Sequence, residues 1–341
     1  MYDGLKVLDV HSHVSAPMGG VGQFNMLMQA TNGIMPSPID KPSAAAQYGL
    51  GDEDFARSVG NHLAYIDERQ IDVQVLGPRP FLMQGWMQDH LLPAWTRFVN
   101  DCIAKQVAMQ PTRFLGACQL PQNVHAPDAA HMVAEVDRCV SEHGFVGAYL
   151  SPDPEGRRNS PGLNDRWWDP LYARCQSGGL PIIIHGTNCL DPRIRHVPHN
   201  YQLGFVIEQY LATQILSHGD VFDRFPELKV IVCHCGGALD RFIPGDPHLA
   251  QRDLSNNLFF DTCAHDVHFL ECAFKQRGVQ RMAFGTEAPG SGREPRPEGP
   301  GITGDDLVPV IGSFEFLSDT EKKDVFHHNP AKLFPQMAGL G

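Results

Sequence analysis

Short apolar segments alternate with longer segments of helical periodicity along most of the chain. Residues 6–10, 72–77, 113–120, 145–150, 180–185, 229–234, 257–261 and 281–285 are rich in β-branched and apolar side chains and predict strands. Apolar residues recur at three- and four-residue spacing over 52–70, 91–110, 126–142, 166–177, 201–225 and 267–276, which predicts amphipathic helices. Eight strands that alternate with helices predict a closed (β/α)8 TIM barrel rather than an open doubly wound sheet.

Two segments interrupt this alternation and are too long for ordinary connections. Residues 15–51 follow the first predicted strand, and residues 288–304 follow the eighth, where five glycines and four prolines occur. Long loops of this kind are usually functional, so we expect both to cover the carboxyl-terminal mouth of the barrel. Residues 305–334 are predicted to form closing helices. We therefore expect one barrel domain over residues 1–341.

Composition and charge restrict the class of partner. The chain of 341 residues carries 27 basic and 39 acidic side chains, a formal net charge of −12, which argues against a nucleic-acid-binding face. No apolar run reaches the roughly 18 residues of a membrane span, and no signal peptide is recognisable. We expect a cytoplasmic protein without membrane contact. The nine cysteines are interpreted as free thiols in apolar segments.

The first chemical signal is a histidine pair at the end of the first strand. His11 and His13 lie in the sequence Asp9-Val10-His11-Ser12-His13. Residues i and i+2 of a strand share a face, so both imidazoles project the same way and can bind one metal ion. Two surface or core-capping histidines would show the same spacing, so the pair is weak evidence by itself.

The ends of other predicted strands strengthen this signal. His185 ends the fifth strand, His234 ends the sixth, and Glu287 follows the eighth. The carboxyl ends of barrel strands converge on one site, so four of the 17 histidines and one acid are expected to meet there. A metal-free binding protein on a barrel scaffold remains an alternative, but it would not need His11, His13, His185 and Glu287 together.

These motifs resemble the amidohydrolase superfamily, in particular its amidohydrolase-2 branch. The resemblance spans almost the whole chain and also includes His234-Cys235-Gly236-Gly237-Ala238 and the closing Asn329-Pro330-Ala331-Lys332-Leu333-Phe334. It implies that His11, His13, His185 and Glu287 are metal ligands and that His234 is a catalytic acid or base beside the metal. The usual HGGG after strand six is HCGG here, with Cys235 in place of a glycine.

Within this branch the motifs are most similar to those of a C–C hydrolase for meta-cleavage products and of 4-oxalomesaconate hydratase, which share the Gly285-Thr286-Glu287 pattern. They are more distant from aminocarboxymuconate-semialdehyde decarboxylase, because the decarboxylases usually carry Asp at the position of Glu287. The resemblance implies a hydrolase or hydratase of aromatic catabolism that acts on a carboxylated ring-cleavage product, and commonly a homodimer. The alternative is a nonoxidative decarboxylase of a hydroxybenzoate or a muconate semialdehyde.

The donor set suggests the cofactor and the catalytic groups. The fourth predicted strand ends without the Lys or Glu that bridges two metals in binuclear members, so one ion per chain is expected. Three imidazoles and a carboxylate suit Zn²⁺, with Mn²⁺ or Fe²⁺ as alternatives. The metal would acidify a water molecule, while His234 and Glu287 are predicted to be catalytic and His234 to carry a proton.

The expected substrate is a small carboxylate, which requires cationic or polar partners at the mouth. Arg79 lies in a rigid loop between two prolines after the second strand, and a guanidinium fork matches a carboxylate. Arg193 and Arg241, after strands five and six, are further candidates, although each could be a surface ion pair. Asp153 and Asn188 complete the predicted substrate-binding set.

Overall fold

The structure is a computed structural model that describes residues 1–15, 51–187, 189–197, 200–241, 252–297 and 299–340, with only the backbone of residues 195, 200 and 201. Eight strands form one sheet in which each strand pairs in parallel with the next along the chain. The strands are β1 (Leu8–His13), β2 (Val73–Gly77), β3 (Phe114–Gln119), β4 (Gly147–Leu150), β5 (Ile182–Ile184), β6 (Val230–Val232), β7 (Leu258–Asp261) and β8 (Met282–Ala283).

Hydrogen bonds from the β8 end to β1 bring the sheet back onto itself. The backbone N–H of Val10 donates to the carbonyl of Phe284 at 2.9 Å, and the N–H of Glu287 donates to the carbonyl of His11 at 2.8 Å. The predicted barrel is therefore confirmed, and each predicted strand segment overlaps an observed strand. The first strand begins and ends later than predicted, so His11 and His13 lie inside β1.

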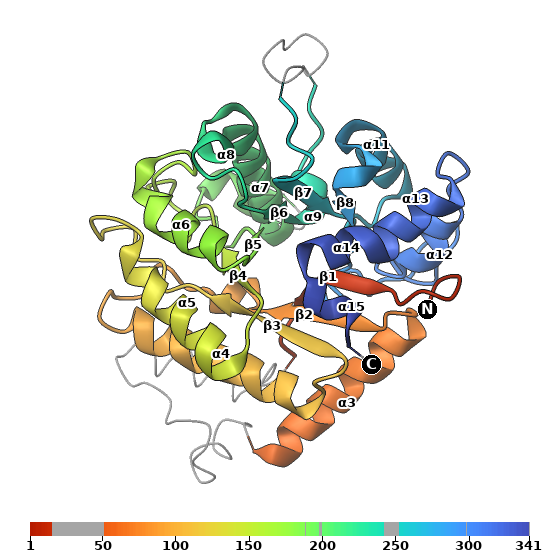
Figure 1. Cartoon of the computed structure of the whole chain (residues 1–341), viewed down its shortest axis with the longest axis horizontal. Helices are drawn as coiled ribbons and strands as arrows, with labels where there is room; N and C mark the ends of the chain where they lie inside the picture. The colour runs from red at the N-terminus through yellow and green to blue at the C-terminus, as the bar shows by residue number, and fades with distance from the viewer. Residues whose placement is uncertain (16–50, 188, 198–199, 242–251, 298, 341) are drawn as a thin grey trace.

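Helices surround this ring of strands (Figure 1). The larger ones are α3 (Asp52–Glu68), α4 (Leu92–Met109), α5 (Ala130–His143), α6 (Asp169–Ser177), α7 (Asn200–His218) and α11 (Val267–Arg277), and the short α8 (Val221–Arg224) follows α7. The chain closes with α12 (Leu307–Gly312), α13 (Asp319–Lys323), a π-turn over Asp324–His328, α14 (Asn329–Leu333) and α15 (Pro335–Ala338), as predicted. Among the described helices, none is both long and apolar enough to cross a bilayer.

The helices follow the apolar periodicity, with one difference. Helix α3 buries Phe55, Val59 and Ile66 on a single face, at the spacing that an amphipathic helix requires. The helix predicted over 201–225 is interrupted, because α7 ends at His218 and α8 begins at Val221. Glycine has a low helix propensity, and Gly219 stands at this interruption.

Alternate strand residues divide the core into an interior and an outer shell. On β5, Ile183 packs inside the barrel, whereas Ile182 and Ile184 pack toward the helices. This two-sided burial explains why the strands are apolar almost throughout. Phe334 and Met337 belong to the interior cluster and cover the amino-terminal end of the barrel. The carboxyl-terminal mouth is the end at which polar side chains gather.

A close approach at Gly116 on β3 yields the first prediction. A Cβ at this position would lie 2.3 Å from the ring of the buried Phe145, so Gly116→Ala should destabilise the fold by about 1–3 kcal/mol through overpacking. Gly60 on α3 has no atom within 4 Å of its Cβ position, so Gly60→Ala should stabilise by about 0.5–1 kcal/mol. Urea denaturation of both variants provides the measurement, and a Gly116→Ala protein as stable as wild type would contradict the packing argument.

Candidate metal centre and active site

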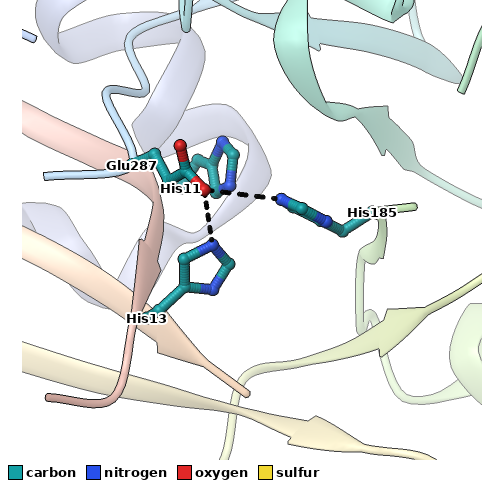
Figure 2. A group of neighbouring side chains, drawn as sticks. All are labelled: His11, His13, His185 and Glu287. Atoms are coloured by element: carbon teal, nitrogen blue, oxygen red, sulfur yellow. Dashed lines mark ion pairs between the residues drawn. The ribbon is translucent and has the colours of Figure 1, made fainter. Parts of the chain in front are cut away.

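Four side chains predicted from the sequence meet at the barrel mouth. His11 and His13 come from β1, His185 follows β5, and Glu287 follows β8, and Figure 2 shows all four pointing toward one another. One donor atom from each lies within 4.8 Å of the others. The Nε2 atom of His13 is 3.4 Å from Glu287 Oε1, and that of His185 is 4.0 Å from the same oxygen. All four residues are buried.

The three imidazoles present unsatisfied nitrogen atoms to this common point. The Nε2 atoms of His11, His13 and His185 are buried and lack a hydrogen-bond partner among the described residues. Buried polar atoms without partners are uncommon and require an explanation. Three imidazole nitrogens and one carboxylate form a donor set that fits a divalent transition-metal ion. The residues therefore form a buried His/His/His/Glu metal site.

The hydrogen-bond partner of Nδ1 determines which tautomer of each ligand histidine is present. Nδ1 of His11 lies 2.6 Å from Asp261 Oδ2, Nδ1 of His13 lies 2.8 Å from the Pro78 carbonyl, and Nδ1 of His185 lies 2.6 Å from the Gly186 carbonyl. Carbonyl and carboxylate oxygens only accept hydrogen bonds, so Nδ1 must carry the proton. The lone pair of each Nε2 is then directed toward the metal site.

Burial and charge keep the site in the protonation state that a metal needs. Burial lowers the pKa of His13 to about 4 and, together with the neighbouring imidazoles, lowers the pKa of His185 well below its ordinary value. Burial opposes ionisation of Glu287, but the nearby imidazoles of His13 and His234 outweigh it and hold the pKa of Glu287 well below its ordinary value. At His11 burial also lowers the pKa, but the hydrogen bond and charge of Asp261 outweigh it and raise the pKa of His11. The site thus combines two imidazoles that favour the neutral form, His13 and His185, with an anionic carboxylate.

His234 lies beside this set but has a different hydrogen-bond partner. Its Nε2 is 3.8 Å from Glu287 Oε2, and its ring centroid is 5.0 Å from that of His185. Its Nδ1 faces the side-chain amide of Gln209, at 2.9 Å from Nε2 and 3.1 Å from Oε1 of that amide. An amide can donate or accept, so Gln209 can pair with either tautomer of His234. This partner suits a histidine that exchanges protons.

The turn after β6 holds His234 in an unusual backbone conformation. His234 has φ 54° and Cys235 has φ 56°, both in the left-handed region that favours glycine, and Glu287 has φ 61°. Such strained residues cluster at functional sites. Glycine adopts this conformation without strain, so the backbone at Cys235 agrees with the HGGG pattern implied by the resemblance. Here the N–H of Cys235 donates to Asp261 Oδ1 at 3.0 Å.

Two buried acids support the site but were not among the predicted site residues. Asp261 is the last residue of β7, and the predicted strand over 257–261 ends at the same residue. Its carboxylate accepts hydrogen bonds from the backbone N–H groups of Cys235 and Cys263 and contacts His11. Asp9 accepts a 2.6 Å hydrogen bond from the Thr286 hydroxyl and so links β1 to the β8 end. The position of Asp261 at a strand end was the signal that could have identified it.

The predicted substrate-binding residues are spread over several environments. Half-buried Arg79 lies at the mouth, where it donates to the carbonyls of Val14 at 3.1 Å and Pro289 at 3.2 Å and so joins the loops after β1 and β8. Arg193 is exposed and pairs with Asp191 in its own loop. Buried Asp153 accepts a hydrogen bond from the backbone N–H of Arg158 in its own loop.

The remaining two candidates receive less structural support. Arg241 is exposed beyond the turn after β6. Asn188 lies outside the described residues, as does most of the long loop predicted to cover the mouth after β1. The loop after β8 does reach the mouth as predicted, because Ser291 donates a 2.7 Å hydrogen bond to Glu287 Oε2.

A cavity of about 220 Å³ opens beside His234. Its lining includes the apolar Phe205, Val206 and Phe269, and its polar lining includes Ser291 and His265. Binding sites are typically apolar pockets with a few polar groups that orient the ligand. The cavity therefore gives a small organic molecule access to His234.

The comparisons with known proteins agree with this geometry. A family model described as amidohydrolase matches residues 8–336, which is nearly the whole chain. The chain belongs to the amidohydrolase-2 family. The resemblance drawn from the motifs is confirmed, and the protein is a metal-dependent enzyme of this family.

Individual relatives include hydratases and a decarboxylase. The chain is 31% identical over 299 residues to 2-keto-4-carboxy-3-hexenedioate hydratase of Sphingobium sp. (strain SYK-6), covering 84% of this chain and 86% of the relative. The crystal structure of 4-oxalomesaconate hydratase from Rhodopseudomonas palustris matches with a TM-score of 0.81 at 25% identity, over 98% of this chain and 97% of that one.

A third structure, dihydroxybenzoic acid decarboxylase from Polaromonas sp. JS666 with bound manganese and the inhibitor 2-nitroresorcinol, matches with a TM-score of 0.66. Its identity is 22%, and the match covers 97% of both chains. This likeness establishes the shared fold.

The contact between His11 and Asp261 yields the second prediction. In Asp261→Asn the amide oxygen is needed by the two backbone N–H donors, so the amide NH₂ faces His11 Nδ1 and places the ring proton on Nε2. Metal affinity should fall by about 10–100-fold, measured by competition with a chelator. Asp305→Asn is the matched control, because it alters a buried carboxylate that pairs with Arg69 instead. Unchanged metal affinity in Asp261→Asn would refute this role.

Proposed function

We propose that the protein is a Zn²⁺-dependent hydratase or C–C hydrolase that acts on a carboxylated product of aromatic ring cleavage. The observation that carries this proposal is the placement of His234, whose Nε2 lies 3.8 Å from Glu287 Oε2 and which lines the cavity. The 31% identity to an oxo-diacid hydratase over 84% of the chain supports the reaction class. A nonoxidative decarboxylase is the alternative, supported by the decarboxylase fold likeness.

His11, His13, His185 and Glu287 would hold the metal. A divalent ion there supplies Lewis acidity, which acidifies water and polarises substrate oxygens. His234 is proposed to move a proton between its Nε2 and the substrate, while Gln209 holds the ring in position through either tautomer. The water that adds to a C=C bond then contributes a hydroxyl group to one carbon and a proton to the other.

The walls of the cavity suit a flat conjugated substrate. Phe205 and Phe269 provide apolar faces, and Arg79 at the mouth is the proposed partner of a substrate carboxylate. Arg79 is preferred to Arg193 because the guanidinium of Arg193 is exposed and already paired with the carboxylate of Asp191. Asp153, Asn188 and Arg241 stay predictions.

Assays of the purified protein against three substrate groups discriminate among the reactions. We expect water addition to 2-keto-4-carboxy-3-hexenedioate or a related oxo-diacid, or C–C cleavage of a meta-cleavage product, each followed by the loss of ultraviolet absorbance from the conjugated system. CO₂ release from dihydroxybenzoates, without activity on the first two groups, would favour the decarboxylase. Reconstitution of metal-depleted protein with Zn²⁺, Mn²⁺ or Fe²⁺ identifies the active ion, since ligand type selects poorly among them.

Replacement of His234 yields the third prediction. His234→Asn should lower turnover by about 10²–10⁴-fold, because it removes the proton-transfer group, and should leave the bound metal unchanged. Steady-state kinetics and metal analysis of the same preparation provide the two measurements. Loss of the ion held by His11, His13, His185 and Glu287 in His234→Asn would make His234 a ligand of that ion and would refute the proton-transfer role.

Replacement of Arg79 yields the fourth prediction. Arg79→Lys keeps the charge but removes the fork geometry, so KM for a carboxylated substrate should rise by about tenfold or more with a smaller change in kcat. Arg193→Lys is the matched control and should leave KM nearly unchanged, because Arg193 is exposed and bound to Asp191. An equal effect of both substitutions would argue against a substrate contact at Arg79.

A further inference from the structure

A second group of metal-binding side chains lies on the other side of Glu287. Donor atoms of His234, Cys263 and Glu287 all lie within 4.8 Å of one another. His234 and Cys263 line the cavity of about 220 Å³, so an ion entering this cavity reaches them directly. Neither residue belongs to the set of His11, His13 and His185.

The two oxygens of Glu287 face different neighbours. Oε1 lies 3.4 Å from His13 Nε2 and 4.0 Å from His185 Nε2, whereas Oε2 lies 3.8 Å from His234 Nε2. Ser291 donates a 2.7 Å hydrogen bond to Oε2 and so fixes its position. A carboxylate oxygen has more than one acceptor direction, so Oε2 can receive this bond and still contact an ion. Glu287 is therefore arranged to bridge two ions.

Cys263 supplies the donor that determines the kind of ion. It follows β7, and its Sγ lies 3.4 Å from the Thr286 carbonyl, which directs the thiol toward the β8 end beside Glu287. Thiolate sulfur favours Zn²⁺, Co²⁺ or Cd²⁺ over hard ions such as Mg²⁺ and Ca²⁺. A metal-binding role would distinguish Cys263 from the other cysteines, which are interpreted as free thiols in apolar segments.

We propose that His234 Nε2, Cys263 Sγ and Glu287 Oε2 form a second site for a borderline or soft divalent cation, bridged through Glu287 to the resident ion. As the sulfur–metal bond forms, the proton of the Cys263 thiol passes to solvent. A water molecule completes the coordination from the side of the cavity. The resident ion is the one that His11, His13, His185 and Glu287 would hold, and the second cation is additional to it. The sequence predicted one ion per chain because only bridging residues on strand four were considered.

A neighbouring donor group does not meet the same conditions. His11, Cys233 and Asp261 also have donor atoms within 4.8 Å of one another. Nδ1 of His11 is already bound to Asp261 at 2.6 Å, and Cys233 is packed in the barrel interior without solvent access. The second ion is therefore assigned to the group that faces the cavity.

A bound second ion should also affect catalysis, and this expected effect rests on the proposed function. An ion on His234 Nε2 prevents that nitrogen from transferring a proton, so excess Zn²⁺ should inhibit the enzyme. The binding itself requires no substrate and no assumption about the reaction. Failure of the proposed activity and failure of the second site can therefore be distinguished.

The test measures metal stoichiometry in the full chain. Metal-depleted wild-type protein and the variants Cys263→Ala, Cys263→Ser and Cys272→Ala are dialysed against excess Zn²⁺, and bound zinc is determined by elemental analysis. We expect two ions per chain for wild type and for Cys272→Ala, whose replaced thiol is exposed on α11. Both Cys263 variants should bind one ion, and circular dichroism checks that they are folded.

Co²⁺ titration provides a spectroscopic readout of the sulfur bond. In wild type a thiolate-to-cobalt charge-transfer band should appear with the second equivalent, because the first equivalent enters a site made of nitrogen and oxygen donors. The band should be absent from both Cys263 variants and present in Cys272→Ala. A single zinc ion in wild type, or a second ion and band that persist after Cys263 is replaced, would overturn the proposal.

Discussion

The active site depends on the direction of three imidazole rings. Each ligand histidine donates its Nδ1 proton to an oxygen that can only accept, namely Asp261 Oδ2 or the carbonyls of Pro78 and Gly186. The Nε2 lone pairs are therefore aimed at one point before any metal binds. The barrel makes this possible because β1, β5 and β7 end on the same side, so the acceptors and the rings arrive together.

Charge at this site is decided locally and not by the whole chain. The chain has a net charge of −12, yet the proposed substrates are anions. Around the metal, burial keeps His13 and His185 neutral, and Glu287 contributes one negative charge. A divalent cation leaves the set of His11, His13, His185 and Glu287 net positive, and Arg79 adds a further positive charge at the mouth. An acidic surface is therefore compatible with an anionic substrate, while it still disfavours nucleic acid.

The pattern of the chain could predict the barrel and most of the metal site, because both depend on periodicity. Strand residues i and i+2 share a face, which brought His11 and His13 together, and strand ends converge, which added His185 and Glu287. The supporting contacts depend on backbone geometry that no pattern reports. The left-handed turn at His234 and Cys235 is an example, and the pairing of Gln209 with His234 joins residues 25 positions apart on different elements.

Glu287, which follows β8, lies between the metal-ligand histidines and His234. Its Oε1 lies nearest to His13, on the metal side, and its Oε2 lies nearest to His234, on the cavity side. An aspartate is shorter by one C–C bond, about 1.5 Å, so the same backbone would withdraw its oxygens from at least one of these imidazoles. Glu287 has a left-handed backbone, and its N–H donates to the His11 carbonyl, which fixes this residue relative to β1. The length of the Glu287 side chain therefore allows one carboxylate to contact both the metal ligands and His234.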